Sequence, residues 1–561
     1  MQRVIICFFI ISFLFIYTQQ INAQCSWVMG SSETADYSAD SWSLTYDDED
    51  NYYVAGAFRE EFTASGISFN APERGQGYFV AKYNTEGEII WGKVIEAFAE
   101  SISFLPKIER IDDRLFIAGA ASNDIIVDGV NYGDADLYNI FLIGMDTVGN
   151  FEFVHTFPDS ASAAFPYVAG ITRDNQNKIY ITGRFSGYLN WGPVTATSSS
   201  HTTYVAKFNS NGNFIDYDKT SSPGAATSRG WAITADSDNN VIFGGFFQNT
   251  LSFNTCFQEL TEISAGTSPY IVKMDSTFNC LWMIVGDKEQ EFSPVYGITT
   301  DAENNIYACG NFKDTISFNG TILTDNEGTF FLLKLNSDGN VIWAKNFGNA
   351  NTTGQAASSV NIDSAGNIWV TGWQLVNSNY GAVTLNGEGV FAVKLDSSGN
   401  VLEGIKGEGL ATSYASEIDN EGNLIISGAA EGEVISFDDA EGYEYSSGSS
   451  KGFFILRYYL DSDSCIDDSI PDAINEIKII NDLVISPNPS NGDFSIIYES
   501  NTTEEADILI YDVAGKQIQS AITHIYSGEN NIPIHIEPAP GYYTVKMRTQ
   551  KQLYVSRVLI E

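Results

Sequence analysis

The stretch "GITTDAENNIYACG", residues 297–310, joins a short apolar strand, a turn rich in Asp and Asn, and a second strand that ends in glycine. The apolar run that closes on glycine recurs through the chain, at Gly56, Gly119, Gly183, Gly245, Gly310, Gly372 and Gly428. These glycines lie 63, 64, 62, 65, 62 and 56 residues apart. A period of this length indicates one structural unit repeated side by side. The sequence therefore predicts seven copies of that unit.

Each unit carries a second marker downstream of its glycine. In the fifth unit it reads "FLLKLNSDGNVIW", residues 331–343, which is a strand with a lysine, a glycine turn and a strand with tryptophan. The segments are rich in Val, Ile, Phe, Tyr and Thr and have no helical period, so each unit holds four short strands. Four strands repeated seven times predict an all-β, seven-bladed β-propeller. The longer insertions between the glycine and lysine strands predict loops or small hairpins on one side of the disc.

The seventh unit stops before its fourth strand. The stretch "CSWVMG", residues 25–30, looks like that strand without the rest of a blade. Because an open ring leaves sheet edges unpaired, we expect Trp27 to Gly30 to form the outer strand of the seventh blade. This closure would also bring Cys25 near Cys465, and a disulfide between them is predicted if their Cα atoms approach within about 7 Å.

The units, written D-x-x-x-N-I-Y-V-T-G-x-F followed by F-V-A-K-Y-N-x-x-G-N-x-I-W, resemble bacterial seven-bladed propeller repeats of secreted and cell-surface proteins. The resemblance covers residues 25 to about 460, and the propeller domain is predicted over residues 24–460. It implies an architecture and says little about activity, because propellers support many unrelated functions.

The chain begins with Arg3, an apolar run and a polar stretch that ends in Ala23. This order is typical of a secretory signal peptide, so residues 1–23 are expected to be removed. No later segment is long and apolar enough to predict an integral membrane span. An acidic linker is predicted over residues 461–482.

Residues 483–561 alternate apolar and polar positions between Gly, Asn and Pro, which predicts a small antiparallel β-sandwich. The segment resembles the C-terminal sorting domain of type IX secretion, and the matching residues are Pro487, Pro489, Asp512, Gly515, Gly541 and Tyr542. The resemblance implies contact with the type IX secretion machinery. It also implies passage through the periplasm of a Gram-negative bacterium to the cell surface or beyond.

The formal net charge of −42 disfavours nucleic acid and anionic membrane surfaces as partners. Five cysteines follow the signal peptide, and their spacing shows no metal or redox pattern. Cys256 and Cys280 flank one strand of the fourth unit, so we expect a disulfide between them. Cys309 lies in a predicted buried strand and should be a free, inert thiol.

The repeated charged residues admit two interpretations each. The Asp-rich turns are explained by Asp and Asn capping their own backbone, and Asp236 and Asp238 are the candidates if calcium binds instead. No other cofactor is predicted. The cations Lys82, Lys207, Lys273, Lys334, Lys394 and Arg457 recur at one position, where Gly144 breaks the series. Pairing with acids near the first strand is favoured over a ring for an anionic ligand.

No catalytic motif or histidine ligand spacing is found. The leading hypothesis is thus a secreted or cell-surface binding or adhesion module for a protein or glycan. One alternative is an extracellular hydrolase or lyase for polysaccharide or peptide, with carboxylates from different blades meeting near the channel. The other is a structural component of a surface layer.

Overall fold

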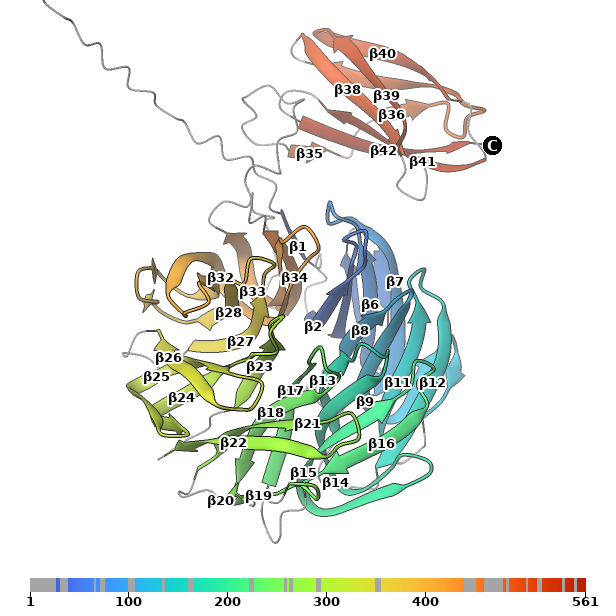
Figure 1. Cartoon of the computed structure of the whole chain (residues 1–561). Coiled ribbons are helices and arrows are strands. Elements are labelled where there is room, and N and C mark those ends of the chain that lie inside the picture. The colour runs from blue at the N-terminus through green and yellow to red at the C-terminus, as the bar shows by residue number, and fades with distance from the viewer. Residues whose placement is uncertain are drawn as a thin grey trace, which may run out of the picture. The chain divides into compact units, whose positions relative to one another are not determined.

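We describe the protein from a computed structural model. It describes residues 27–30, 39–64, 67–70, 76–98, 106–133, 137–159, 166–220, 227–256, 260–261, 266–288, 294–348, 355–437, 451–458, 478–480, 484–500, 503–511, 517–536, 540–548 and 552–560. These residues form β-strands and turns without an α-helix, as predicted (Figure 1). The chain divides into two compact units, Met1–Ile466 and Asp467–Glu561, which are described separately.

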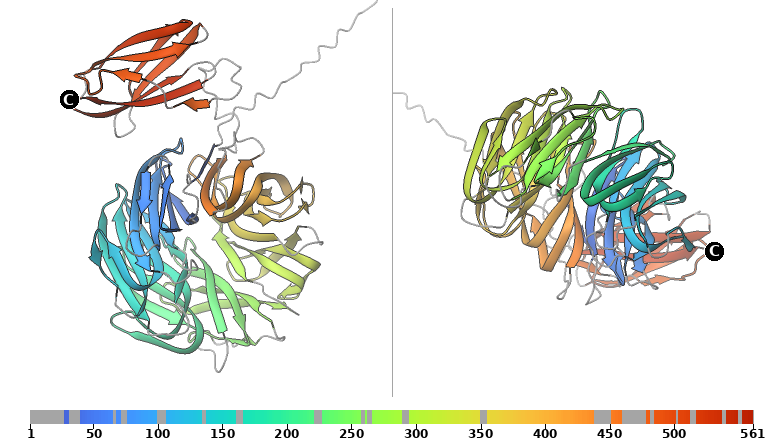
Figure 2. Two further views of the ribbon diagram at one scale, coloured as in Figure 1. Left: turned by 180° about the vertical axis from the view of Figure 1, so that it is seen from behind. Right: turned by 90° about the horizontal axis from the view of Figure 1, so that it is seen from below.

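The strands of the first unit pair in successive antiparallel groups of four, one group for each sequence repeat (Figures 1 and 2). We number the groups as blades 1 to 7. Blade 1 contains β2 (Ala39–Tyr46), β3 (Tyr52–Arg59), β6 (Gln76–Tyr83) and β7 (Ile89–Phe98). Blade 2 contains β8 (Lys107–Ile111), β9 (Arg114–Val127), β11 (Tyr138–Asp146) and β12 (Phe151–Asp159). Blade 3 contains β13 (Tyr167–Arg173), β14 (Ile179–Asn190), β15 (Thr195–Phe208) and β16 (Phe214–Lys219).

The same order continues through the remaining repeats. Blade 4 contains β17 (Thr227–Ala235), β18 (Val241–Gln248), β21 (Ser268–Met274) and β22 (Cys280–Lys288). Blade 5 contains β23 (Val295–Thr300), β24 (Ile306–Phe318), β25 (Thr321–Leu335) and β26 (Val341–Phe347). Blade 6 contains β27 (Gln355–Ile362), β28 (Ile368–Gln374), β31 (Gly389–Leu395) and the start of β32 (Val401–Ile418). Blade 7 contains the end of β32, β33 (Leu424–Phe437), β34 (Lys451–Tyr458) and β1 (Trp27–Gly30). The pairings support the predicted blade order, and seven blades remain the sequence-based prediction.

The N-terminal strand joins the last repeat. β1 pairs antiparallel with β34, with Trp27 opposite Arg457 and Gly30 opposite Phe454, as the sequence predicted. Blades 7 and 1 are also joined by side chains, because the Ser41 Oγ donates to the Gly428 carbonyl at 3.0 Å. Cys25 and Cys465 lie outside the described residues, so their disulfide stays a prediction.

Antiparallel order places the connections of the first unit on two faces. We call the face with the turns between first and second strands and between third and fourth strands the turn face. The opposite face, the insertion face, carries the connections between second and third strands. Short extra strands occur in these connections, as expected: β4 (Glu61–Ala64), β5 (Ile67–Asn70), β10 (Val130–Asn131), β19 (Thr250–Leu251), β20 (Leu260–Thr261), β29 (Ser378–Asn379) and β30 (Thr384–Leu385).

The repeated glycine is needed because the backbone of the innermost strand lies very close to it. The innermost strand of six blades carries a β-bulge where it pairs with the second strand, as between Val168 and Gly170 in blade 3. The bulge brings a carbonyl oxygen to the glycine, so that a Cβ at Gly183 would lie 1.9 Å from the Tyr167 oxygen. No side chain fits at that distance, and the marker that revealed the repeat is therefore required by this bulge.

A second contact locks neighbouring blades together on the turn face. Trp282 of blade 4 covers the glycine turn of blade 5, and a Cβ at Gly339 would lie 2.7 Å from its indole ring. Where blade 3 has Asp216 instead of an aromatic residue, the blade 4 turn replaces glycine by Phe278. Phe278 adopts a positive φ of 60° and is 3% exposed. The phenylalanine thus fills, from the turn itself, the space that tryptophan fills elsewhere.

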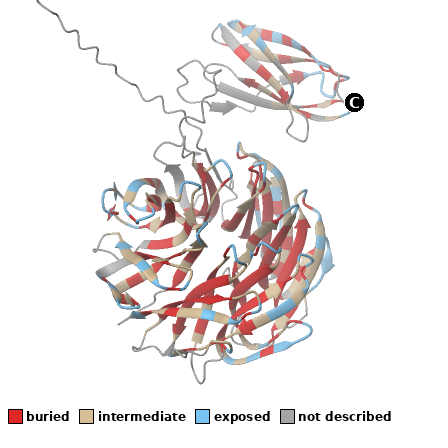
Figure 3. Ribbon diagram, viewed as in Figure 1, coloured by how far each residue is buried: buried red, intermediate tan, exposed pale blue. Residues whose placement is uncertain are grey.

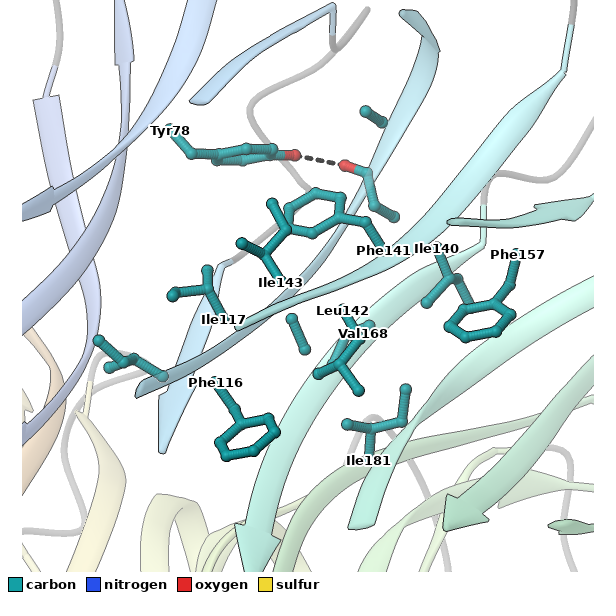
Figure 4. Packing of buried hydrophobic residues seen from close by; sticks show 14 of the residues in the cluster. Tyr78, Phe116, Ile117, Ile140, Phe141, Leu142, Ile143, Phe157, Val168 and Ile181 are labelled. Atoms are coloured by element: carbon teal, nitrogen blue, oxygen red, sulfur yellow. Dashed lines mark hydrogen bonds between the residues drawn. The ribbon is translucent and has the colours of Figure 1, made fainter. Parts of the chain in front are cut away.

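Apolar side chains fill the space between blades (Figure 3). Figure 4 shows the cluster of blades 1 to 3, in which Phe141 and Phe116 are fully buried and the Tyr78 hydroxyl donates to the Ala120 carbonyl. The predicted disulfide is present, since Cys256 and Cys280 are bonded. Cys309 is free and buried, and burial raises its thiol pKa to about 12, which agrees with the predicted inert thiol.

The second unit contains two small sheets around one core. One sheet has the order β35 (Lys478–Ile480), β42 (Gln552–Ile560), β41 (Gly541–Arg548), β38 (Glu504–Tyr511), β39 (Gln517–Ile525). The other has the order β36 (Val484–Ser486), β37 (Asp493–Ser500), β40 (Gly528–His535). Ile496 and Val545 from the two sheets belong to one apolar cluster, as a sandwich requires. β35 lies within residues 461–482, so the predicted linker is not structureless throughout: its Lys478–Ile480 segment pairs in parallel with β42.

Candidate functional site

The repeated cations pair mostly within the protein. Four of them reach the acid that follows the first strand of their own blade, as predicted: Lys82 with Asp47 (3.2 Å), Lys273 with Asp236 (2.7 Å), Lys334 with Asp301 (3.9 Å) and Arg457 with Asp419 (3.0 Å). Lys394 instead reaches Glu403 of the fourth strand at 3.6 Å. Lys207 donates to the Ser276 carbonyl of the next blade. The pairing hypothesis is thus confirmed for four of the six positions, and these cations do not form a free positive ring.

Blade 4 shows the pairing in an almost fully buried form. One carboxylate oxygen of Asp236 accepts the backbone N–H groups of Asp238 and Asn240, and the other accepts the Asn240 amide and the Lys273 ammonium. Burial opposes ionisation, but the hydrogen bonds from Lys273 and Asn240 outweigh it and lower the Asp236 pKa below its usual value.

These partners bear on the calcium alternative. Both oxygens of Asp236 are occupied by donors, and Asp238 accepts the Asn304 amide at 3.0 Å. Turn capping and ion pairing therefore account for both acids. In the part of the chain that the structure describes, no three His, Cys, Asp or Glu side chains are grouped to hold a metal.

Blade 2 departs from the other repeats at several linked positions. Its turn between the first two strands contains two residues, Asp112 and Asp113, where blade 1 has the five residues 47–51. Gly144 stands at the cation position, and β8 pairs with β9 without a bulge. The bulge of the outermost strand carries an exposed aliphatic residue in five blades: Ile90, Ile215, Leu281, Ile342 and Leu402. Blade 2 has Glu152 there.

A cleft of about 320 Å³ opens where the usual ion pair is missing. This blade-2 cleft lies on the turn face and includes residues of the neighbouring blade 3, and it is lined by Ile111, Asp112, Asp113, Arg114, Phe116, Glu152, Asn177 and Ser210. Arg114 pairs with Glu152 and donates to the Ser210 carbonyl. Its side chain is 31% exposed, whereas that of Lys273 is 4% exposed. Arg114 therefore lies at the surface, beside the three carboxylates of the cleft lining.

A second group of titratable side chains lies on the innermost strands. Glu109 of β8 and Glu417 of β32 stand at the same position of the repeat, opposite Phe116 and Ile425 in their strand pairs. Burial raises the pKa of Glu109 to about 7, although Arg173 at 3.4 Å opposes the shift. Burial, reinforced by the charge of Glu109, raises the pKa of Glu417 to about 8. Both pKa shifts favour the protonated form of these carboxyls.

The residues of these two groups were not singled out from the sequence. Arg114 is one of 29 Lys and Arg residues, and Glu109 and Glu417 are two of 71 acidic residues. The interruption at Gly144 was visible, and it was the one signal that pointed to blade 2.

Residues 484–561 match the family described as the secretion system C-terminal sorting domain. The C-terminal unit is a sorting domain. It directs the chain through type IX secretion to the cell surface or outside, as the sequence predicted. Pro487 and Pro489 follow β36, and Gly541 and Tyr542 begin β41, whereas Asp512 and Gly515 lie outside the described residues. Among the described segments, no helix has the length and hydropathy needed to cross a membrane.

Solved structures match the chain only at low similarity. The WD40 domain of Neurospora crassa Pan2 is 8% identical with a TM-score of 0.35, over 75% of this chain and 90% of that chain. A Dyadobacter fermentans protein of unknown function is 8% identical with a TM-score of 0.33, over 77% and 98%. The endosialidase of phage phi92 is 9% identical with a TM-score of 0.28, over 96% and 87%. No curated protein matches the chain significantly.

Proposed function

We propose that this exported propeller is a binding module for an extracellular protein or glycan, and that the ligand contacts the blade-2 cleft. The observation that carries the proposal is the local loss of the ion pair that occupies this place in blades 1, 4, 5 and 7. There the cation and acid satisfy each other in a largely buried setting. In blade 2 Gly144 stands at the cation position, and Arg114 of the second strand pairs with Glu152 at the surface, beside a cleft.

The lining groups can offer both donors and acceptors to a ligand. Arg114 has a planar set of N–H donors, and Asp112, Asp113 and Glu152 offer carboxylate oxygens. Asn177 donates to Asp112 at 3.3 Å, so the blade 3 side of the cleft is held in place. Such a mixed polar surface suits the hydroxyl groups of a sugar or the charged and amide groups of a peptide.

The test is binding of the full mature chain to arrays of glycans and of extracellular peptides. The variant Arg114→Ala should lose at least about tenfold in affinity, because a hydrogen bond to a charged donor contributes about 1.5 to 3 kcal/mol. Arg59→Ala is the matched control, since Arg59 is an exposed arginine at the end of β3, away from the cleft lining. Equal affinity of Arg114→Ala and the unmodified protein for every bound probe would exclude this cleft as the ligand site.

A second candidate is the extracellular hydrolase. It is favoured by one observation, the two carboxyls Glu109 and Glu417 with raised pKa values on the innermost strands. Paired acids in different protonation states are the groups that glycoside hydrolysis uses. Turnover of a polysaccharide or peptide panel, abolished by Glu417→Gln and by Glu109→Gln, would establish this function. If no substrate of the panel were turned over at pH 5 to 8, the hydrolase would be rejected and the binding proposal would stand.

A further inference from the structure

The innermost strands carry a second, independent pattern at their bulges. The unpaired bulge residue in the six bulged blades is Trp42, Ala169, Trp231, Tyr296, Ser358 and Tyr414. A β-bulge turns one side chain away from the regular alternation of its strand, and bulges of this kind often aim a side chain at a ligand. Four of the six are large aromatic residues, and all four are partly exposed.

These aromatic residues form two pairs. Trp42 of blade 1 stacks on Tyr414 of blade 7, with ring centroids 3.7 Å apart and an angle of 16°. Trp231 of blade 4 meets Tyr296 of blade 5 edge-on at 5.3 Å. The strands β2, β17 and β23 face the middle of the ring (Figure 1). The first pair lies where β2 of blade 1 contacts β32 of blade 7, and the second lies where β17 of blade 4 contacts β23 of blade 5.

The polar groups near the two pairs are distributed unevenly. Next to the Trp42 pair, Lys107 donates to the Trp42 carbonyl at 3.1 Å, and Glu417 follows Tyr414 by three residues on β32. Next to the other pair, the position equivalent to Glu417 is Thr234 in blade 4 and Thr299 in blade 5, and Arg229 precedes Trp231 by two residues on β17. One side thus combines aromatic faces with a carboxyl and a lysine, and the other combines them with hydroxyls and an arginine.

We infer that the bulged aromatics Trp42, Tyr414, Trp231 and Tyr296 form a binding site for a neutral oligosaccharide. Sugar rings present apolar C–H faces that stack on indole and phenol rings, and their hydroxyls pair with carboxyl, hydroxyl and amine groups. The net charge of −42 disfavours an acidic glycan. The site differs from the blade-2 cleft, so it goes beyond the function proposed above.

A buried-core explanation accounts for these residues less well. Core aromatics of this protein, such as Phe116 and Phe141, are fully buried. The four bulge residues retain exposure, and nothing in the strand pairing requires a ring at the bulge, since Ala169 and Ser358 occupy it in blades 3 and 6. Packing therefore does not by itself explain the aromatic residues at the bulge position of the other four blades.

The test is titration of the mature chain with cellohexaose, maltohexaose, mannohexaose and, as the acidic comparison, oligogalacturonate. We expect at least one neutral hexamer to bind and to change the tryptophan fluorescence, with no binding of oligogalacturonate. Trp42→Ala and Trp231→Ala should each weaken that binding about fivefold or more, because stacking of an aromatic ring contributes about 1 kcal/mol or more. Arg114→Ala should leave it unchanged, which separates this site from the cleft.

Two further measurements keep the test decisive. If Trp42→Ala unfolds, Trp42→Phe keeps a ring in place, and it should bind with intermediate affinity at an unchanged thermal midpoint. Absence of binding by all three neutral hexamers would overturn the inference. So would neutral-hexamer binding that both tryptophan variants retain in full, or equal binding of oligogalacturonate.

Discussion

Blades 4 and 2 have the same repeat, but blade 4 has a buried ion pair at the position where blade 2 has none. In blade 4 the turn acid Asp236 and the third-strand cation Lys273 meet at 2.7 Å with almost no exposure. In blade 2 the turn is shorter, the cation position is Gly144, and Arg114 lies at the surface beside a cleft. A buried ion pair fixes a geometry, whereas a half-exposed one leaves its groups available to a ligand. The difference shows how one copy of a repeat can lose a structural ion pair, so that its position can serve function, while other copies keep the pair and the structure.

The largest effect on stability should come from the contact between blades 7 and 1, where a buried ion pair lies beside the strand that closes the ring. Arg457 pairs with Asp419 and also donates to the Thr85 carbonyl of blade 1 at 3.1 Å. Its own strand is covered by β1. Deleting residues 25–31 should cost about 5 kcal/mol or more, because buried backbone groups of β34 lose their partners. A urea midpoint equal to that of the intact chain would refute closure by β1.

Breaking the blade 4 pair should have the next largest effect. Lys273→Met removes the cation and leaves the carboxylate of Asp236 buried, and such a change costs about 3 to 5 kcal/mol. The double variant Asp236→Asn with Lys273→Met should recover a large part of this loss, because no unpaired charge remains. Chemical unfolding of the three proteins measures both values. A loss below about 1 kcal/mol for Lys273→Met would mean that the blade 4 pair is no stronger than a surface pair.

How far the sequence predicts this structure depends on whether a signal repeats. The glycine marker, the cation and acid positions, the Cys256–Cys280 bond and the pairing of β1 all follow from the period of the repeat. The residues Asp216 and Phe278 do not, because they lie in different blades and each departs from the repeat at a different position. The blade-2 cleft is equally hidden, since it results from a shortened turn, Gly144 and Glu152 acting together.

The contact between blades 3 and 4 allows the compensation itself to be tested. Phe278→Gly leaves a cavity, which costs about 3 kcal/mol or more, while release of the positive φ returns about 1 kcal/mol. The net loss should be about 2 to 3 kcal/mol. Adding Asp216→Trp to Phe278→Gly should restore at least about 1 kcal/mol, because it recreates the tryptophan-on-glycine contact of the other blades. A double-mutant cycle with no coupling would show that the two positions vary independently.

A smaller effect is expected from the acids of the innermost strands. The folded pKa of Glu417, about 8, lies above its unfolded value near 4.3, so the folded state holds the proton more tightly. Stability from this group is therefore complete below about pH 4.3 and is lost as the pH rises toward 8. Glu417→Gln should flatten that decline and gain about 1 kcal/mol over the unmodified chain at pH 8, since partial exposure reduces the penalty. Parallel stability curves for the two proteins between pH 5 and 8 would contradict the shift.

The smallest effect on stability should come from the blade-2 cleft, and this result completes the comparison with blade 4. Arg114 and Glu152 are 31% and 35% exposed, and exposed ion pairs contribute about 0.2 to 1 kcal/mol. Arg114→Ala should thus shift the urea midpoint by far less than Lys273→Met, although both remove a cation from the same region of a blade. If Arg114→Ala instead cost as much as Lys273→Met, Arg114 would be a structural cation that has moved from the third strand to the second. Blade 2 would then contain a variant of the structural ion pair of blade 4, and Arg114 would not be available to a ligand in the cleft.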